Sequence, residues 1–161
     1  MSHLILLAMS ACIGGCVNPF APPLGSVGSR IWSDQSTAGE LLENFELSYD
    51  YQDSIRYADC LDESFIFQYY DEENGRSDHW FLDTDLKATG GLFNSFDRID
   101  LEWVQVPEEV VQFDYPDSTL SFITRFHLTL AEEAPILGFA RFEVRQNDDG
   151  KFRVISWRDD F

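Results

Sequence analysis

Basic residues are scarce in this sequence. Its 161 residues include 11 Lys or Arg against 29 Asp or Glu, which gives a formal net charge of -18. Such an excess of negative charge would repel phosphate groups, so it argues against nucleic-acid binding and against adhesion to anionic lipid by charge alone. The apolar content of 44% is too high for a disordered acidic chain, and the length suits one domain with a buried core.

Recognisable catalytic motifs are also missing. The sequence contains no Ser-His-Asp pattern, no glycine-rich phosphate loop and no metal-ligand spacing. The acidic turns at residues 71–75 and 148–150 do not fit the twelve-residue calcium loop. The sequence therefore predicts no metal and no cofactor.

Long apolar runs are absent beyond one at the start of the chain. Residues 4–13 are apolar over ten positions, about half of the roughly 20 needed to span a bilayer, and have the length of a secretory signal. Ile13-Gly14-Gly15-Cys16 follows and resembles the lipobox of bacterial lipoproteins. This resemblance implies cleavage before Cys16 and lipidation of its thiol. The alternative for the run is a buried N-terminal helix or strand.

The lipobox resemblance also implies a domain organisation and a location. Residues 1–15 are expected to be a signal peptide, residues 16–35 a lipidated cysteine with a Pro- and Gly-rich tether, and residues 36–161 a single domain. The partner at this end of the chain would be a membrane, reached through the lipid anchor of a bacterial cell envelope. Val17, in place of an aspartate after the cysteine, favours the outer membrane, facing the periplasm of a Gram-negative cell.

Cysteines are few, and this limits their roles. Cys12 leaves with the signal and Cys16 is expected to be lipidated, so Cys60 is the one thiol of the mature chain. Its apolar surroundings and the lack of a neighbouring histidine favour a small buried side chain over a nucleophile. A Cys16–Cys60 disulfide is the alternative if Cys16 is not lipidated.

Hydrophobic periodicity predicts helices first and strands afterwards. Thr37 and Glu40 form a capping box ahead of a helix, followed by a helical segment at 55–61 and a short helix at 83–93 interrupted by Gly90-Gly91. Alternation predicts strands at 64–70, 96–106, 119–130, 136–146 and 151–157, with a polar loop at 71–78 and a hairpin turn at 147–150. This order indicates an α+β fold.

The same order resembles nuclear transport factor 2-like domains. The resemblance rests on the long first helix, on Phe65-Ile66-Phe67, on the short helix ending at Leu92-Phe93, and on the closing hairpin with Trp157-Arg158-Asp159. It implies a cone-shaped, cystatin-like domain in which N-terminal helices pack in a curved antiparallel sheet, often around a pocket. Members include isomerases, dehydratases and domains that only bind, so the fold does not fix the function.

Strand alternation predicts which side chains face that pocket. One face gathers aromatic residues and almost no charge, with Trp157 joining them if a bulge shifts the register near Ile155-Ser156. The predicted lining residues are Phe67, Tyr69, Trp103, Phe122, Phe142 and Trp157. A filled core and a cavity for a small apolar ligand are both open interpretations.

Two functions follow from this face. The first is a non-catalytic binding or interaction domain. The second is a small enzyme of the isomerase or dehydratase type, in which a carboxylate or imidazole moves a proton in an apolar cavity. Asp97 and His79 are the candidates for that acid–base role, whereas His127 alternates outward. The missing inward His–Asp pair favours the first function.

The opposite face of the sheet carries basic residues in an otherwise acidic chain. Arg125, Arg141, Arg145 and Arg153 share the outward parity. They fit either cross-strand ion pairs on a wet face or a surface that docks a second copy or another protein.

Overall fold

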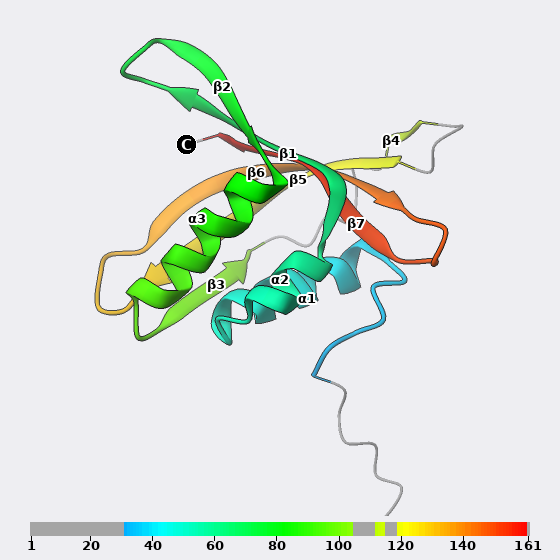
Figure 1. Ribbon diagram of the computed structural model, residues 1–161, viewed down its shortest axis with the longest axis horizontal. Coiled ribbons are helices and arrows are strands. Elements are labelled where there is room, and N and C mark those ends of the chain that lie inside the picture. The colour runs from blue at the N-terminus through cyan, green and yellow to red at the C-terminus, as the bar shows by residue number, and fades with distance from the viewer. Residues whose placement is uncertain (1–30, 105–111, 115–118, 161) are drawn as a thin grey trace, which may run out of the picture. The chain divides into compact units, whose positions relative to one another are not determined.

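The computed structural model describes residues 31–104, 112–114 and 119–160 (Figure 1). Helix α1 (Ala38–Asp50) begins at the predicted capping box: Thr37 Oγ1 accepts a 3.1 Å hydrogen bond from the Glu40 N–H. The Glu40 carboxylate accepts a 2.7 Å bond from the Ser36 N–H. Leu41, Phe45 and Tyr49 lie on the buried side of the helix. The spacing of these apolar residues thus predicted both the helix and its inner face.

Two further helices follow. Helix α2 (Ser54–Asp59) begins at Asp53, whose carboxylate accepts bonds from the N–H groups of Ile55 and Arg56. Helix α3 (Leu82–Ser95) continues through Gly90 and Gly91, so the predicted interruption there is wrong. A mid-helix glycine costs about 1 kcal/mol relative to alanine, which weakens a helix without ending it when tertiary contacts hold both sides.

Within the described residues, seven strands form one sheet. Their bounds are β1 (Leu61–Asp71), β2 (Arg76–Phe81), β3 (Ile99–Trp103), β4 (Gln112–Asp114), β5 (Thr119–Leu130), β6 (Ile136–Gln146) and β7 (Phe152–Asp160). The order is β2-β1-β7-β6-β5-β3, and β4 also pairs with β5. The α+β class is confirmed, but the sheet is mixed and not purely antiparallel, because β1 pairs with β7 in parallel. Figure 1 shows the three helices on one side of this curved sheet.

The strand predictions hold in the second half of the chain and fail near residue 75. Strands β5 and β6 occupy the predicted ranges. The predicted polar loop at 71–78 is instead a hairpin, because β2 starts at Arg76 and pairs with β1. Strand β3 is shorter than the predicted 96–106, and β4 was not predicted.

A bulge in β7 returns Trp157 to the inner face. Val144 pairs with Val154 and Glu143 pairs with Ser156, so Ile155 is the extra residue between them. The register shift predicted near Ile155-Ser156 is therefore present. The turn that joins β6 and β7 has Gly150 at φ 78°, a conformation that glycine adopts without strain.

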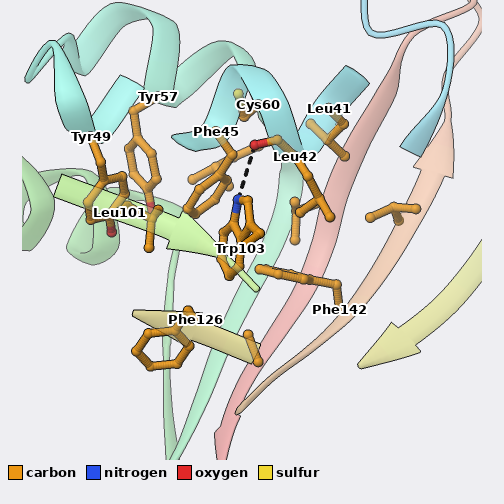
Figure 2. Packing of buried hydrophobic residues seen from close by; sticks show 14 of the residues in the cluster. Leu41, Leu42, Phe45, Tyr49, Tyr57, Cys60, Leu101, Trp103, Phe126 and Phe142 are labelled. Atoms are coloured by element: carbon orange, nitrogen blue, oxygen red, sulfur yellow. Dashed lines mark hydrogen bonds between the residues drawn. The ribbon is translucent and has the colours of Figure 1, made fainter. Parts of the chain in front are cut away.

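The core lies between α1 and the inner face of the sheet (Figure 2). The ring of Phe45 packs 5.3–5.9 Å from the rings of five other aromatic residues, Tyr49, Tyr57, Trp103, Phe142 and Trp157. The indole N–H of Trp103 donates a 3.1 Å hydrogen bond to the Leu42 carbonyl, drawn as the dashed line in Figure 2. Cys60 is buried against this core, with its Sγ 3.3 Å from the Arg56 carbonyl.

Residues 31–35, which the sequence analysis assigned to the tether, contact the folded domain. The Asn44 side chain exchanges two hydrogen bonds with the backbone of Ser33, at 2.8 and 3.1 Å. The carbonyl of Gln35 accepts a 2.8 Å bond from the Phe152 N–H. The predicted signal peptide, Cys16 and the rest of the tether lie outside the described residues. In the part of the chain that is described, no helix has the length and apolar character needed to cross a bilayer.

Candidate functional site

A cavity of about 120 Å³ opens beside the core, between α1 and strands β3, β5, β6 and β7. Its described lining residues are Tyr49, Leu101, Trp103, Phe126, Leu128, Ile136, Trp157 and Asp159. The pairs Leu101–Leu128 and Trp103–Phe126 face each other across β3 and β5. Figure 2 labels four of these lining residues, Tyr49 on α1, Leu101 and Trp103 on β3, and Phe126 on β5.

Two small residues of β6 pair with strands that line the cavity. On the inner face of that strand, Gly138 lies beside Phe126, and Ala140 lies between Thr124 and Asp159. A residue without a side chain and one with a single methyl group cannot fill the space that Phe142 fills two positions further on. Neither small residue is among the described lining residues of the cavity, and Ala140 is fully buried.

Asp159 is the one acidic residue among the described lining residues. Its Oδ1 accepts a 2.5 Å hydrogen bond from the indole N–H of Trp157, two residues earlier on the same strand. That bond holds the carboxylate against an otherwise apolar wall. A carboxylate in such a setting interacts more strongly with a bound charge than one in bulk water.

Tyr49 is the other polar group of the cavity. It is 5% exposed, and burial together with the negative charge of Asp85 raises the pKa of its phenol, with a further contribution from Asp159. The phenol therefore stays protonated, and its hydroxyl interacts with the side chains of Thr89 and Tyr57.

A buried polar network lies behind Tyr49. Tyr57 packs 5.6 Å from the Tyr49 ring and donates a 2.6 Å hydrogen bond to Oδ2 of Asp85. Oδ1 of Asp85 accepts a 3.0 Å bond from the Trp80 indole. Burial raises the pKa of Asp85, while the bonds from Tyr57 and Trp80 partly oppose that rise. Asp85 is therefore a second carboxylate in the network behind Tyr49, but it is not among the described lining residues of the cavity.

The comparisons with known proteins show the fold. No protein-family model and no curated protein matches the chain. Among solved structures, a putative aromatic ring hydroxylase from Novosphingobium aromaticivorans aligns with a TM-score of 0.58 at 15% identity, over 76% of this chain and 84% of that one. A protein of unknown function with a cystatin-like fold, from Nostoc punctiforme, aligns with a TM-score of 0.54 at 18% identity, over 74% of this chain and 84% of that one.

A third structure names the fold group directly. A nuclear transport factor 2-like protein of unknown function from Shewanella baltica aligns with a TM-score of 0.52 at 11% identity, over 75% of this chain and 87% of that one. This chain has the nuclear transport factor 2-like fold. At these identities the likeness concerns architecture alone, so function has to be argued from the cavity.

Within the nuclear transport factor 2-like fold, the six predicted lining residues have different places. Trp103 and Trp157 line the 120 Å³ cavity. Phe67, Phe122 and Phe142 are buried in the core. Tyr69 lines another cavity, of about 390 Å³ and with mixed polar walls, together with Gln68, Tyr70, Glu72, Ser77, Arg158 and Asp159.

The two predicted acid–base candidates do not line the apolar cavity. His79 lies on β2 with its side chain 52% exposed, and its Nδ1 is 3.9 Å from the Asp78 carboxylate. Asp97 is exposed between α3 and β3. Across the described ranges, no three His, Cys, Asp or Glu side chains are grouped closely enough to hold a metal ion.

The four predicted outer-face arginines separate into two pairs. Arg145 lies 2.9 Å from the buried Asp62 carboxylate, and Arg153 lies 2.6 Å from that of Asp149. Arg125 stacks 5.2 Å above the Phe139 ring. Arg141 is exposed and, among the described residues, makes no ion pair. Two of the four arginines thus form ion pairs with carboxylates of the same domain.

The sequence analysis did not single out Tyr49, Asp85 or Asp159 as functional residues. Tyr49 fits the apolar stripe of α1, and Asp85 lies in a helix where nothing local signals burial. Asp159 could have been predicted as a lining residue, because it lies two residues after Trp157 and therefore faces the same side of β7.

Proposed function

We propose that this domain binds a small molecule with an apolar body in the cavity lined by Tyr49, Trp103, Phe126, Trp157 and Asp159, without chemical conversion of it. The observation that supports this proposal is the hollow itself, which has aromatic walls and two polar groups. Binding sites of this kind combine apolar walls with a few polar groups that orient the ligand.

The volume of the cavity limits the size of the ligand that it can hold. A dry cavity of about 150 Å³ holds benzene, so 120 Å³ has room for about five non-hydrogen atoms. At a ceiling of about 1.5 kcal/mol per atom, five atoms contribute about 7.5 kcal/mol, which corresponds to micromolar affinity at best. Longer ligands would have to extend past Ile136, which is 41% exposed.

A blocking substitution tests this proposal. Ile136→Trp should fill the opening, whereas Leu137→Trp adds the same bulk to the next residue, which is 59% exposed and not among the described lining residues. The probes are benzene, tert-butanol and tetramethylammonium, followed through the indole NMR signals of Trp103 and Trp157. At least one probe should shift these signals in the wild type and in Leu137→Trp, and not in Ile136→Trp. The absence of any shift in the wild type would refute the binding function.

The alternative, an isomerase or dehydratase, has one form that this cavity favours. Asp159, and neither His79 nor Asp97, would have to be the base, because it is the lining carboxylate. Such a reaction builds negative charge on the substrate, yet two carboxylates already act on Tyr49. This arrangement supports binding over oxyanion chemistry.

We also propose that the mature protein is a lipoprotein of the bacterial envelope, held at the outer membrane through Cys16. The lipobox-like sequence before Cys16 supports this proposal. Labelled palmitate should enter the wild-type chain in bacterial cells and should not enter Cys16→Ser. Cys60→Ser is the matched control, since burial raises the pKa of the Cys60 thiol to about 12 and keeps it unreactive in the folded domain. Equal labelling of Cys16→Ser and the wild type would refute the anchor.

The outer face of the sheet remains our proposed surface for a second copy or another protein. Ile123, Leu137 and Phe139 are 42–59% exposed there, beside Arg125 and Arg141. Exposed apolar side chains next to two arginines that form no ion pair within the described ranges suit an acidic surface. Residues 34–85 of the same chain have a net charge of -13 (15 acids, 2 bases). Reversing both charges, Arg125→Glu with Arg141→Glu, should abolish self-association in sedimentation experiments or capture of the partner. If neither changes, this surface is not an interface.

A further inference from the structure

Four aromatic side chains from separate elements surround the apolar cavity. Tyr49 comes from α1, Trp103 from β3, Phe126 from β5 and Trp157 from β7. The rings of Trp103 and Phe126 meet edge to face, 6.4 Å apart at 80°. Aromatic residues gathered around a small space are the usual setting for an organic cation, because the ring faces carry negative potential.

The charge at the cavity has one sign. Of the eight described lining residues, Asp159 is acidic and none is Lys, Arg or His. Asp159 is held in place by the 2.5 Å bond from the Trp157 indole. A neutral ligand would gain nothing from this carboxylate beyond a hydrogen bond, whereas a cation would gain a charge partner.

The charges around Tyr49 also favour a cation over an anion. The pKa of the Tyr49 phenol is raised by burial and by the charges of Asp85 and Asp159, so negative charge is disfavoured at that wall. The net charge of -18 extends this bias to the approach of a ligand, since it concentrates cations near the surface.

We propose that the ligand of this cavity is a small organic cation, a trimethylammonium or comparably substituted ammonium group enclosed by the four aromatic rings and paired with Asp159. This inference rests on the proposed binding function and names the ligand class. A trimethylammonium head with its first methylene has five non-hydrogen atoms, which matches the room in 120 Å³. Its remaining chain would leave the cavity past Ile136.

Two ligands that differ in one atom test the charge. Choline and 3,3-dimethylbutan-1-ol have the same shape, but the second has a carbon in place of the nitrogen and is neutral. Titrated into the full-length protein at low ionic strength, choline should bind at least about tenfold more tightly, because cation–aromatic attraction and the carboxylate act on it alone. Equal affinity for the two would overturn the cation inference while leaving an apolar binding cavity.

Two variants locate the effect. Asp159→Asn should lower choline affinity and so reduce its preference over the neutral alcohol, while binding of the alcohol stays unchanged, which also shows that the variant is folded. Asp149→Asn, an exposed carboxylate in the β6–β7 turn, should change neither affinity. A choline preference that is undiminished in Asp159→Asn, or that survives blocking by Ile136→Trp, would overturn the inference, because it would reflect attraction to the acidic surface. Failure of both ligands to bind the wild type would refute the binding function itself.

Discussion

The hydroxyl of Tyr57 donates a 2.6 Å hydrogen bond to Oδ2 of Asp85, and both residues are buried. This bond joins α2 to α3 through a carboxylate whose other oxygen is bound to the Trp80 indole. The two donors partly compensate for the loss of water around Asp85, so they stabilise the charged form of this buried carboxylate.

Removing the Tyr57 hydroxyl should therefore destabilise the domain. We expect Tyr57→Phe to lower the free energy of unfolding by about 1–3 kcal/mol at pH 7, because it leaves a buried acceptor short of a donor. Tyr51→Phe is the matched control, since Tyr51 is 61% exposed. Urea unfolding of both variants checks this, and equal stability of Tyr57→Phe and the wild type would contradict it.

The pH dependence of stability should report on Asp85. Burial raises its pKa above the unfolded value of 3.8, so the folded state binds more protons than the unfolded chain between those two values. The stability contributed by Asp85 is thus present below pH 4 and is lost as pH rises through the folded pKa. The Asp85→Asn variant has no carboxyl group at this position, so this loss of stability with rising pH should be absent from it. The free energy of unfolding of the wild type minus that of Asp85→Asn should fall as pH rises above 4, and a flat or rising difference would be inconsistent with the raised pKa.

Asp62 should behave in the opposite sense. Burial alone would raise its pKa, but hydrogen bonds from Ser64, Asn147 and Arg145 lower it to about 2. Its contribution to stability is therefore present above pH 4 and is lost as pH falls toward 2. From an unfolded value of 3.8, that loss amounts to about 2 kcal/mol.

The matched experiment on Asp62 uses two Asn variants. The wild type minus Asp62→Asn difference in unfolding free energy should grow from pH 2 to pH 5. Asp149→Asn should show a smaller change, since the Asp149–Arg153 pair lies at the surface, where such pairs contribute about 0–1 kcal/mol. Comparable pH profiles for the two variants would mean that Asp62 does not hold β1 to the β6–β7 hairpin.

The fold could be predicted where the pattern was local. The α1 cap, the two long strands and the Asn147–Gly150 turn each depend on residues within a few positions of one another. The parallel pairing of β1 with β7 joins residues about 90 positions apart, and no local pattern encodes it. Strand β2 was missed because Arg76, Ser77 and Asp78 read as a loop, and their strand conformation comes from pairing with β1.

The sequence predicted some of the residues that line the cavity, but not the cavity itself. Alternation placed Trp103 and Trp157 on the inner face, but whether that face is filled depends on side-chain volume. Gly138 and Ala140 pair with Phe126 and Asp159 respectively but do not themselves line the cavity, so the sequence of β6 did not locate it. The burial of Asp85 could not be foreseen, because it follows from how α3 packs against Tyr57 and Trp80.

Two glycines should respond in opposite ways to the same substitution. Gly150 has φ 78°, where a side chain is strained, although nothing lies within 4 Å of the added Cβ position. Gly150→Ala should therefore lower the free energy of unfolding by about 1–2 kcal/mol for conformational reasons alone. Gly91 lies inside α3, and nothing lies within 4 Å of its Cβ position either, so Gly91→Ala should raise stability by about 0.5–1 kcal/mol. Thermal and urea unfolding of the two variants give the comparison, and a stabilising Gly150→Ala would show that the turn does not require the left-handed conformation.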